Sequence, residues 1–196
     1  MMKTIGLTGG IGSGKSTVSK ILLSLKIPVY DSDSRAKYLM NSSLELKNEI
    51  IENFGENSYV NNQLDKNYIS DIIFNNKFEM NKINLLVHPF VYQDFNKWKK
   101  HIFSKYVFFE SALIFETGSY KNNDFNILVV SDINERIKRV VKRDCLNKKD
   151  VLIRIKNQWN DKKKIPLSDY VIKNISFDQT EKEVCKMIKK LNSKFL

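Results

Sequence analysis

The sequence predicts an α/β protein with a three-layer α/β/α architecture around a mostly parallel five-stranded sheet. Two apolar runs, residues 106–109 and 125–131, are nearly continuous, which is typical of strands covered on both faces. Such strands belong to parallel sheets with helices on each side. Further strands are expected at 3–8, 27–30 and 169–174, and segments with helical spacing of apolar residues separate the strands.

Composition and charge narrow the class of protein. The chain has 196 residues, 42% of them hydrophobic and 28% charged, which fits one domain with a substantial core. A formal net charge of +11 favours polyanionic partners, either nucleic acid or a small phosphorylated ligand. Cys145 and Cys185 lack the spacing of a disulfide framework or a zinc site. Without a membrane-length apolar run or a targeting segment, we expect a cytoplasmic protein that does not contact membranes.

A glycine-rich loop follows the first expected strand. Residues 9–16 read GGIGSGKS, and a segment with helical spacing follows them. In a strand–loop–helix context, the backbone N–H groups of such a loop surround a phosphate, and the helix dipole adds to the attraction. We expect Lys15 to reach the β and γ phosphates and Ser16 to offer its hydroxyl to Mg²⁺. A flexible glycine turn is the alternative.

Two carboxylates follow the second expected strand. Asp31 and Asp33 lie where an open α/β sheet binds its ligands, beside the glycine-rich loop. Asp31 or Ser32 can instead cap a helix that begins near Ser34. We predict that capping explains one carboxylate and chemistry the other.

Residues 35–104 are predicted to form a helical insertion between strands, because their apolar residues recur at helical spacing. The dipeptide His88-Pro89 is expected to break this insertion in two, since proline suits the first turn of a helix. His88 would then lie at a helix start, facing a cleft. A capping or packing role for His88 is the alternative to a ligand contact.

A basic helical hairpin is expected between the last two strands. Residues 133–141 carry an apolar face, and Arg136, Arg139 and Arg143 project from other faces of the same helix. A second helix follows an interruption at residues 144–150. Such a hairpin can close over a nucleotide and bring arginine to its phosphates. A solvated pair of basic helices is the alternative.

Taken together, these motifs resemble the dephospho-CoA kinase family over nearly the whole chain. The matching segments are IGLTGGIGSGKST at 5–17, DSD at 31–33, HP at 88–89, LIFE at 113–116, RD at 143–144 and DYVI at 169–172. Ala112, Ser168 and Ser176 stand where the family usually has proline, alanine and glycine. These departures concern loop shape and the end of the sheet, not groups that do chemistry.

The resemblance implies a P-loop kinase fold and transfer of the ATP γ-phosphoryl group, with Mg²⁺, to the ribose 3′-hydroxyl of dephospho-CoA. It also implies a division of the single domain 1–196 into a core of residues 1–34, 105–144 and 163–196, an acceptor-binding insertion of residues 35–104, and a lid of residues 145–162.

The same resemblance implies roles for individual residues. Asp33, Lys15 and Arg143 would be catalytic, with Asp33 accepting or orienting the hydroxyl proton. The donor phosphates would contact Gly10, Ile11, Gly12, Ser13, Gly14, Lys15, Ser16, Thr17 and Arg143, and Ser16 would hold Mg²⁺. The acceptor would contact Thr8, Asp33, His88, Phe115 and Arg139.

Two other functions are open. One is a different small-molecule or nucleoside-monophosphate kinase, although this loop has Ile11 and Ser16 where adenylate-kinase-type loops carry proline and glycine. The other is a nucleic-acid-binding regulatory ATPase. The sequence contains no RNA-stacking motif, helix-turn-helix or acidic metal-binding run after a strand, so we expect no nucleic-acid partner.

Overall fold

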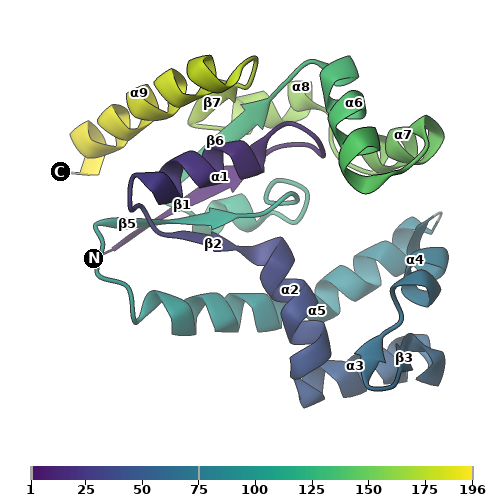
Figure 1. Ribbon diagram of the computed structural model, residues 1–196. Coiled ribbons are helices and arrows are strands. Elements are labelled where there is room, and N and C mark those ends of the chain that lie inside the picture. The colour runs from purple at the N-terminus through teal and green to yellow at the C-terminus, as the bar shows by residue number, and fades with distance from the viewer. Residues whose placement is uncertain (1, 75, 196) are drawn as a thin grey trace. The chain divides into compact units, whose positions relative to one another are not determined.

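A computed structural model describes residues 2–74 and 76–195 of the chain. The chain divides into two compact units, the first comprising residues 1–31 and 103–196 and the second residues 32–102. The first unit contains the sheet and the glycine-rich loop, and the second is mainly helical (Figure 1).

Within the described residues, the first unit is built on a five-stranded sheet with the strand order β2-β5-β1-β6-β7. Neighbouring strands are parallel throughout. The strands are β1 (Lys3–Thr8), β2 (Val29–Asp31), β5 (Tyr106–Glu110), β6 (Phe125–Val130) and β7 (Tyr170–Lys173). The predicted α/β fold with a five-stranded, mostly parallel sheet is therefore confirmed.

Two helices cover one face of this sheet. Helices α1 (Lys15–Ser24) and α9 (Phe177–Phe195) lie side by side (Figure 1) and contact each other. Their apolar stripes pack on alternate strand residues, because successive side chains of a strand point to opposite faces. The fully buried members of this cluster are Ile5, Leu7, Val18, Leu22, Phe108, Ile127, Val129, Ile172, Val184, Met187 and Leu191. This core fixes the carboxyl end of β1, from which the glycine-rich loop leaves.

The predicted helical hairpin lies between β6 and β7. Helix α6 (Ile133–Asp144) begins at the cap Asp132, whose side chain accepts hydrogen bonds from two backbone N–H groups. It is followed by α7 (Lys148–Lys156), α8 (Asp161–Lys164) and a short 3₁₀ turn (Ile165–Leu167). Ile137, Val140 and Val151 form the buried contact between α6 and α7.

Within its described residues, the second unit consists of four α-helices, a short 3₁₀ turn (Glu56–Ser58) and a short hairpin. The elements are α2 (Ser32–Ser42), α3 (Leu44–Phe54), β3 (Tyr59–Val60), β4 (Gln63–Leu64), α4 (Lys66–Phe74) and α5 (Lys77–Lys99). Arg35 of α2 makes two hydrogen bonds to the Asp94 carboxylate of α5, 2.8 and 2.7 Å long.

In the first unit, a short 3₁₀ turn, Ser119–Asn122, lies between β5 and β6.

The prediction that His88-Pro89 breaks the insertion is wrong. Helix α5 continues through Pro89, so His88 lies inside a helix and not at its start. Proline removes one backbone hydrogen bond from a helix interior, which tertiary packing can offset. Val87 and Val91 are buried on either side of the proline, and α5 packs on α2, α3 and α4.

Among the helices of residues 2–74 and 76–195, none combines the length and the apolar character needed to cross a membrane.

Candidate active site

The backbone of the glycine-rich loop turns sharply between β1 and α1. Gly12 and Gly14 have φ angles of +75° and +98°, which side-chain-bearing residues rarely adopt. The Ser13 N–H donates to the Gly10 carbonyl at 3.0 Å and closes the turn. Backbone of this kind forms a concave anion site at the start of a helix.

Three successive carbonyls of the loop receive donors from distant parts of the chain. Arg136 Nε donates to the Ile11 oxygen at 3.0 Å, and Arg139 reaches the Gly12 oxygen at 3.4 Å. The Asn174 amide donates to the Ser13 oxygen at 2.9 Å. These contacts direct the three carbonyl dipoles to protein donors, an arrangement that fits an anion site formed by other N–H groups of the loop.

Asn174 is itself held firmly at the end of β7. It is buried, its backbone N–H donates to Val130, and its side-chain oxygen accepts a hydrogen bond from Thr180 at 2.9 Å. A Cβ added at Gly14 would collide with the Asn174 amide. The glycine is therefore required both by its backbone angle and by the close approach of this side chain.

Helix α1 begins with Lys15, the predicted phosphate contact, and Ser16, the predicted Mg²⁺ ligand. The Lys15 ammonium donates to the Gly9 carbonyl at 2.9 Å, so it lies over the loop that it is predicted to serve. Ser16 is exposed, which leaves its hydroxyl accessible to a cation. Mg²⁺ in nucleotide sites usually takes one or two protein ligands together with phosphates and waters, and Ser16 fits that role.

Two buried hydroxyls border the loop. Thr8 ends β1 and Ser13 lies in the loop, and both side chains are buried. Neither hydroxyl oxygen has a hydrogen-bond partner among the described residues. Buried polar groups are nearly always paired, so these two indicate a polar ligand at this place.

The sheet edge beside the loop carries carboxylates. Asp31 and Glu110 end β2 and β5 and pair directly in register. Glu110 accepts a hydrogen bond from Ser19 of α1 at 2.5 Å, which joins this edge to the helix that follows the loop. Asp33, the predicted catalytic carboxylate, lies in the first turn of α2 in the second unit.

His88 also belongs to the second unit, within α5. Burial lowers the pKa of its imidazole below the ordinary value, because desolvation disfavours the charged form. The predicted acceptor contacts of Asp33 and His88 remain predictions.

The predicted lid arginines differ in their surroundings. Arg143 is 61% exposed and makes two hydrogen bonds to Asp144, 2.7 and 3.0 Å long, which raise its pKa. Arg154 lies 3.7 Å from the same carboxylate. Arg139, one turn before Arg143, reaches the loop, as Arg136 does. The contact of Arg143 with donor phosphates therefore remains a prediction.

Phe115, a predicted acceptor contact, lies in the core. Its side chain is buried, and its ring centroid is 5.5 Å from that of Tyr120. Its contact with the acceptor also remains a prediction.

Sequence reasoning assigned no role to a polar cluster formed by residues 158–164 and Glu116. Gln158 Oε1 accepts the Ile11 N–H at 2.8 Å, and Glu116 accepts the Trp159 N–H at 3.0 Å. Lys164 is completely buried, 2.7 Å from the Glu116 carboxylate. Lys164 is one of three consecutive lysines, so only its place in the fold distinguishes it from its exposed neighbours.

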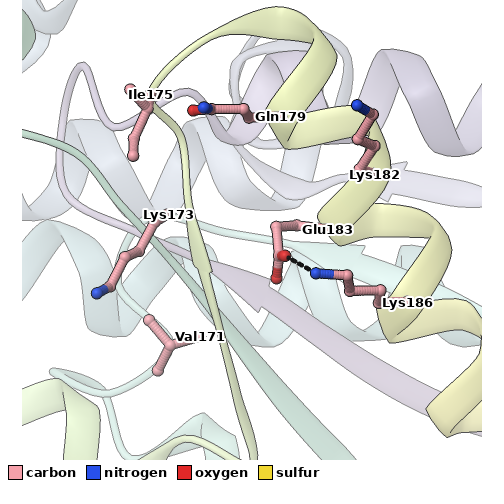
Figure 2. A pocket seen from close by; sticks show the side chains of 7 residues that line it. All are labelled: Val171, Lys173, Ile175, Gln179, Lys182, Glu183 and Lys186. Carbon is pink, nitrogen blue, oxygen red and sulfur yellow. Dashed lines mark hydrogen bonds and ion pairs between the residues drawn. The ribbon is translucent and has the colours of Figure 1, made fainter.

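A cavity of about 460 Å³ lies elsewhere in the first unit, at the exposed edge of β7 (Figure 2). Its lining residues are Val171, Lys173, Ile175, Gln179, Lys182, Glu183 and Lys186. Lys186 is paired with Glu183 at 2.7 Å, as the dashed line in Figure 2 shows. In the described part of the chain, none of the predicted site residues lines this cavity. The glycine-rich loop is therefore the candidate active site.

Comparisons with known proteins give the family of this chain. A protein-family model described as dephospho-CoA kinase matches residues 3–179. The dephospho-CoA kinase of Fusobacterium nucleatum is 36% identical over 173 residues, which covers 88% of this chain and 89% of the relative. That of Listeria monocytogenes is 33% identical over 195 residues, covering 97% and 98% of the two chains.

Solved structures show the same fold. The crystal structure of TT1252 from Thermus thermophilus superposes with a TM-score of 0.85 at 28% identity, covering 96% of this chain and 97% of that one. Dephospho-CoA kinase from Campylobacter jejuni has a TM-score of 0.59 at 22% identity, covering 96% and 97%. The family match spans the loop, the insertion and the hairpin. The chain thus belongs to the dephospho-CoA kinase family, whose reaction, the phosphorylation of dephospho-CoA, is the last step of coenzyme A biosynthesis.

Proposed function

We propose a role for each of the predicted site residues in this kinase reaction. The chain uses ATP as donor and dephospho-CoA as acceptor, as its family does. In our proposal the glycine-rich loop holds the donor phosphates, and the strongest support is the bracing of its three outward carbonyls by Arg136, Arg139 and Asn174. Phosphoryl transfer depends mainly on positioning and on positive charge around the phosphates.

In the donor half, backbone N–H groups of residues 10–17 bind the β and γ phosphates, except those of Ile11, Ser13 and Thr17, which donate to protein oxygens. Lys15 neutralises the phosphate charge. The Lys15 ammonium exchanges its hydrogen bond to the Gly9 carbonyl for one to phosphate oxygen. Ser16 would hold Mg²⁺, which screens the charge on the phosphates when it is bound. The Thr8 and Ser13 hydroxyls lie where they can complete the contacts with the two substrates.

In the acceptor half, Asp33 orients the ribose 3′-hydroxyl and accepts its proton. A bond then forms between the 3′-oxygen and the γ phosphorus, the bond to the β-phosphate oxygen breaks, and ADP leaves. His88, Phe115 and Arg139 are the other acceptor contacts in our proposal, as the family resemblance implies. Arg143 leaves Asp144 when the hairpin closes and adds its charge to the γ phosphoryl group.

An Asp33→Asn variant tests the acceptor half. It keeps the size of the side chain but cannot accept the proton, so we expect kcat to fall by about 10²–10⁴ with the ATP KM unchanged. The matched control is Asp31→Asn, which removes the neighbouring carboxylate at the end of β2. Unchanged turnover in the Asp33 variant and a large loss in the Asp31 variant would transfer the role to Asp31.

A panel of acceptors tests substrate choice. ADP release is measured with dephospho-CoA, AMP, CMP, shikimate and single-stranded RNA, and we expect only dephospho-CoA to stimulate it. Stimulation by a nucleoside monophosphate would favour the alternative function, that of a nucleoside-monophosphate kinase. Stimulation by RNA that declines steeply with salt would favour a nucleic-acid ATPase.

Location in the cytoplasm stays a prediction from the sequence.

A further inference from the structure

Arg136 is a buried arginine that has no part in the chemistry described above. It lies in the first turn of α6 with only 6% of its surface exposed, and burial lowers its pKa although the Asp161 carboxylate acts in the opposite direction. Burying a cation is costly unless partners compensate for the lost water. The contacts of this guanidinium therefore need a structural or functional reason.

Its first contact is with the glycine-rich loop. Nε donates to the Ile11 carbonyl at 3.0 Å. A Cβ added at Gly10 would collide with the Nη2 atom and lie 2.7 Å from Cζ, so the guanidinium occupies the space that a side chain at position 10 would need. A Cβ at Gly12 would approach the backbone oxygen of Arg136 to 2.5 Å. Residue 136 thus packs on the loop through both its side chain and its backbone.

Its second contact is with the start of α8. Nη1 lies 3.4 Å from the Asp161 carboxylate, which is partly buried. Three residues before Asp161, Gln158 accepts the N–H of the same Ile11 whose carbonyl Arg136 holds. Ile11 is therefore held by both of its backbone polar groups, one through α6 and one through the segment that leads into α8.

We propose that Arg136 is a positioning residue for the donor site. It keeps the Ile11 carbonyl turned outward and links the loop to residues 158–161, so that the loop's N–H groups are in place before the phosphates bind. Arg136 acts through the loop and not by contacting the reacting atoms. The proposal rests on the assignment of this loop as the donor site.

The test compares two substitutions of the same residue. Arg136→Met removes every hydrogen bond of the side chain, whereas Arg136→Gln retains a neutral donor for the Ile11 carbonyl. The matched control is Lys138→Met on the same helix, since Lys138 is exposed and its ion pair with Glu135 lies on the surface. kcat and the KM values for ATP and dephospho-CoA are measured for each folded variant, together with its thermal unfolding midpoint.

We expect Arg136→Met to raise the ATP KM by about tenfold or more, the scale of one charge-assisted hydrogen bond, and to leave the dephospho-CoA KM within about twofold. Arg136→Gln should recover most of the loss, and Lys138→Met should match the wild type. A merely structural role would lower the unfolding midpoint without changing the ratio of the two KM values. That result, or equal rises in both, would overturn the proposal.

A Lys15→Ala variant separates this proposal from the donor-site assignment. If Lys15→Ala loses ATP turnover while Arg136→Met and Arg136→Gln keep the wild-type ATP KM, the loop is the donor site and the role of Arg136 is refuted. If Lys15→Ala keeps wild-type turnover, the donor-site assignment itself fails. An Asp161→Asn variant completes a double-mutant cycle, and its effect on the ATP KM should be smaller when Arg136 is already Met.

Discussion

The ammonium of Lys164 lies 2.7 Å from the Glu116 carboxylate, and the whole Lys164 side chain is buried. Glu116 also accepts the Trp159 N–H, so this ion pair anchors the segment next to Gln158, which holds the glycine-rich loop. The pair therefore connects the stability of the first unit with the geometry of the donor site.

Replacing Lys164 by Met should destabilise the protein strongly. The substitution leaves the Glu116 carboxylate buried without its cation, which typically costs about 3–5 kcal/mol. Urea unfolding measures the loss, and Lys163→Met, at the exposed neighbouring position, should change stability by less than about 0.5 kcal/mol. A double variant with Glu116→Gln should recover part of the loss, and a fully additive double variant would contradict the pairing.

Two glycines with similar backbone angles should respond differently to alanine. Gly14 (φ +98°) faces the Asn174 amide, whereas a Cβ at Gly118 (φ +76°) meets nothing within 4 Å. Both substitutions should cost about 1–2 kcal/mol of backbone strain. Only Gly14→Ala should also lower kcat/KM for ATP, by at least about tenfold, because it displaces Asn174 from the Ser13 carbonyl. Equal activities in the two variants would show that Asn174 does not hold the loop.

Removing the Arg143 guanidinium should impair catalysis far more than folding. Its side chain is mostly exposed, so Arg143→Ala should leave the free energy of unfolding within about 0.5 kcal/mol of the wild type. An arginine at transferring phosphates contributes about 10³–10⁵ to kcat, and a loss of this size is expected in steady-state assays. Lys142→Ala, at the adjacent exposed position, is the control. Near-normal kcat in Arg143→Ala would exclude Arg143 from the reaction.

The partly buried imidazole of His88 should make stability depend on pH. Its pKa in the folded protein lies below the ordinary value of 6.5, so the unfolded chain binds more protons in the interval between the two values. This contribution is complete above pH 6.5 and is lost as the pH falls through the lowered pKa. Urea midpoints at pH 7.5 and 5.5, compared for wild type, His88→Gln and the exposed-site control His101→Gln, measure it. Of the two variants, only His88→Gln should reduce the difference between the urea midpoints measured at pH 7.5 and at pH 5.5.

The glycine-rich loop was predictable because its chemistry is local. A strand, glycines at fixed spacing, Lys15 and a helix start all lie within about twenty consecutive residues, and backbone preferences alone favour that arrangement. The strands were predictable for a related reason, since burial on both faces leaves continuous apolar runs. The boundary errors are small, as at β7, where the strand begins at Tyr170 and not at Asp169.

The error at His88-Pro89 has the opposite origin. Proline locally favours the start or end of a helix, but α5 carries buried residues before and after Pro89 and packs on three neighbouring helices. Packing of a long apolar stripe outweighed the loss of one backbone hydrogen bond. Local preference is a weak guide where tertiary contacts extend on both sides of a breaker.

The sequence by itself predicted the α/β class and the family, which are confirmed, and it also predicted a phosphate site at the glycine-rich loop. Only the tertiary structure identified the residues that hold the site: Arg136, Gln158 and Asn174 reach the loop across sequence separations of 125, 147 and 161 residues. Likewise, Lys164 differs from its neighbouring lysines only in being folded inward onto Glu116. The groups predicted to bind the ligand lie close together in the sequence and form a recognisable motif. The residues that orient those groups come from distant elements, and only tertiary packing brings them to the loop.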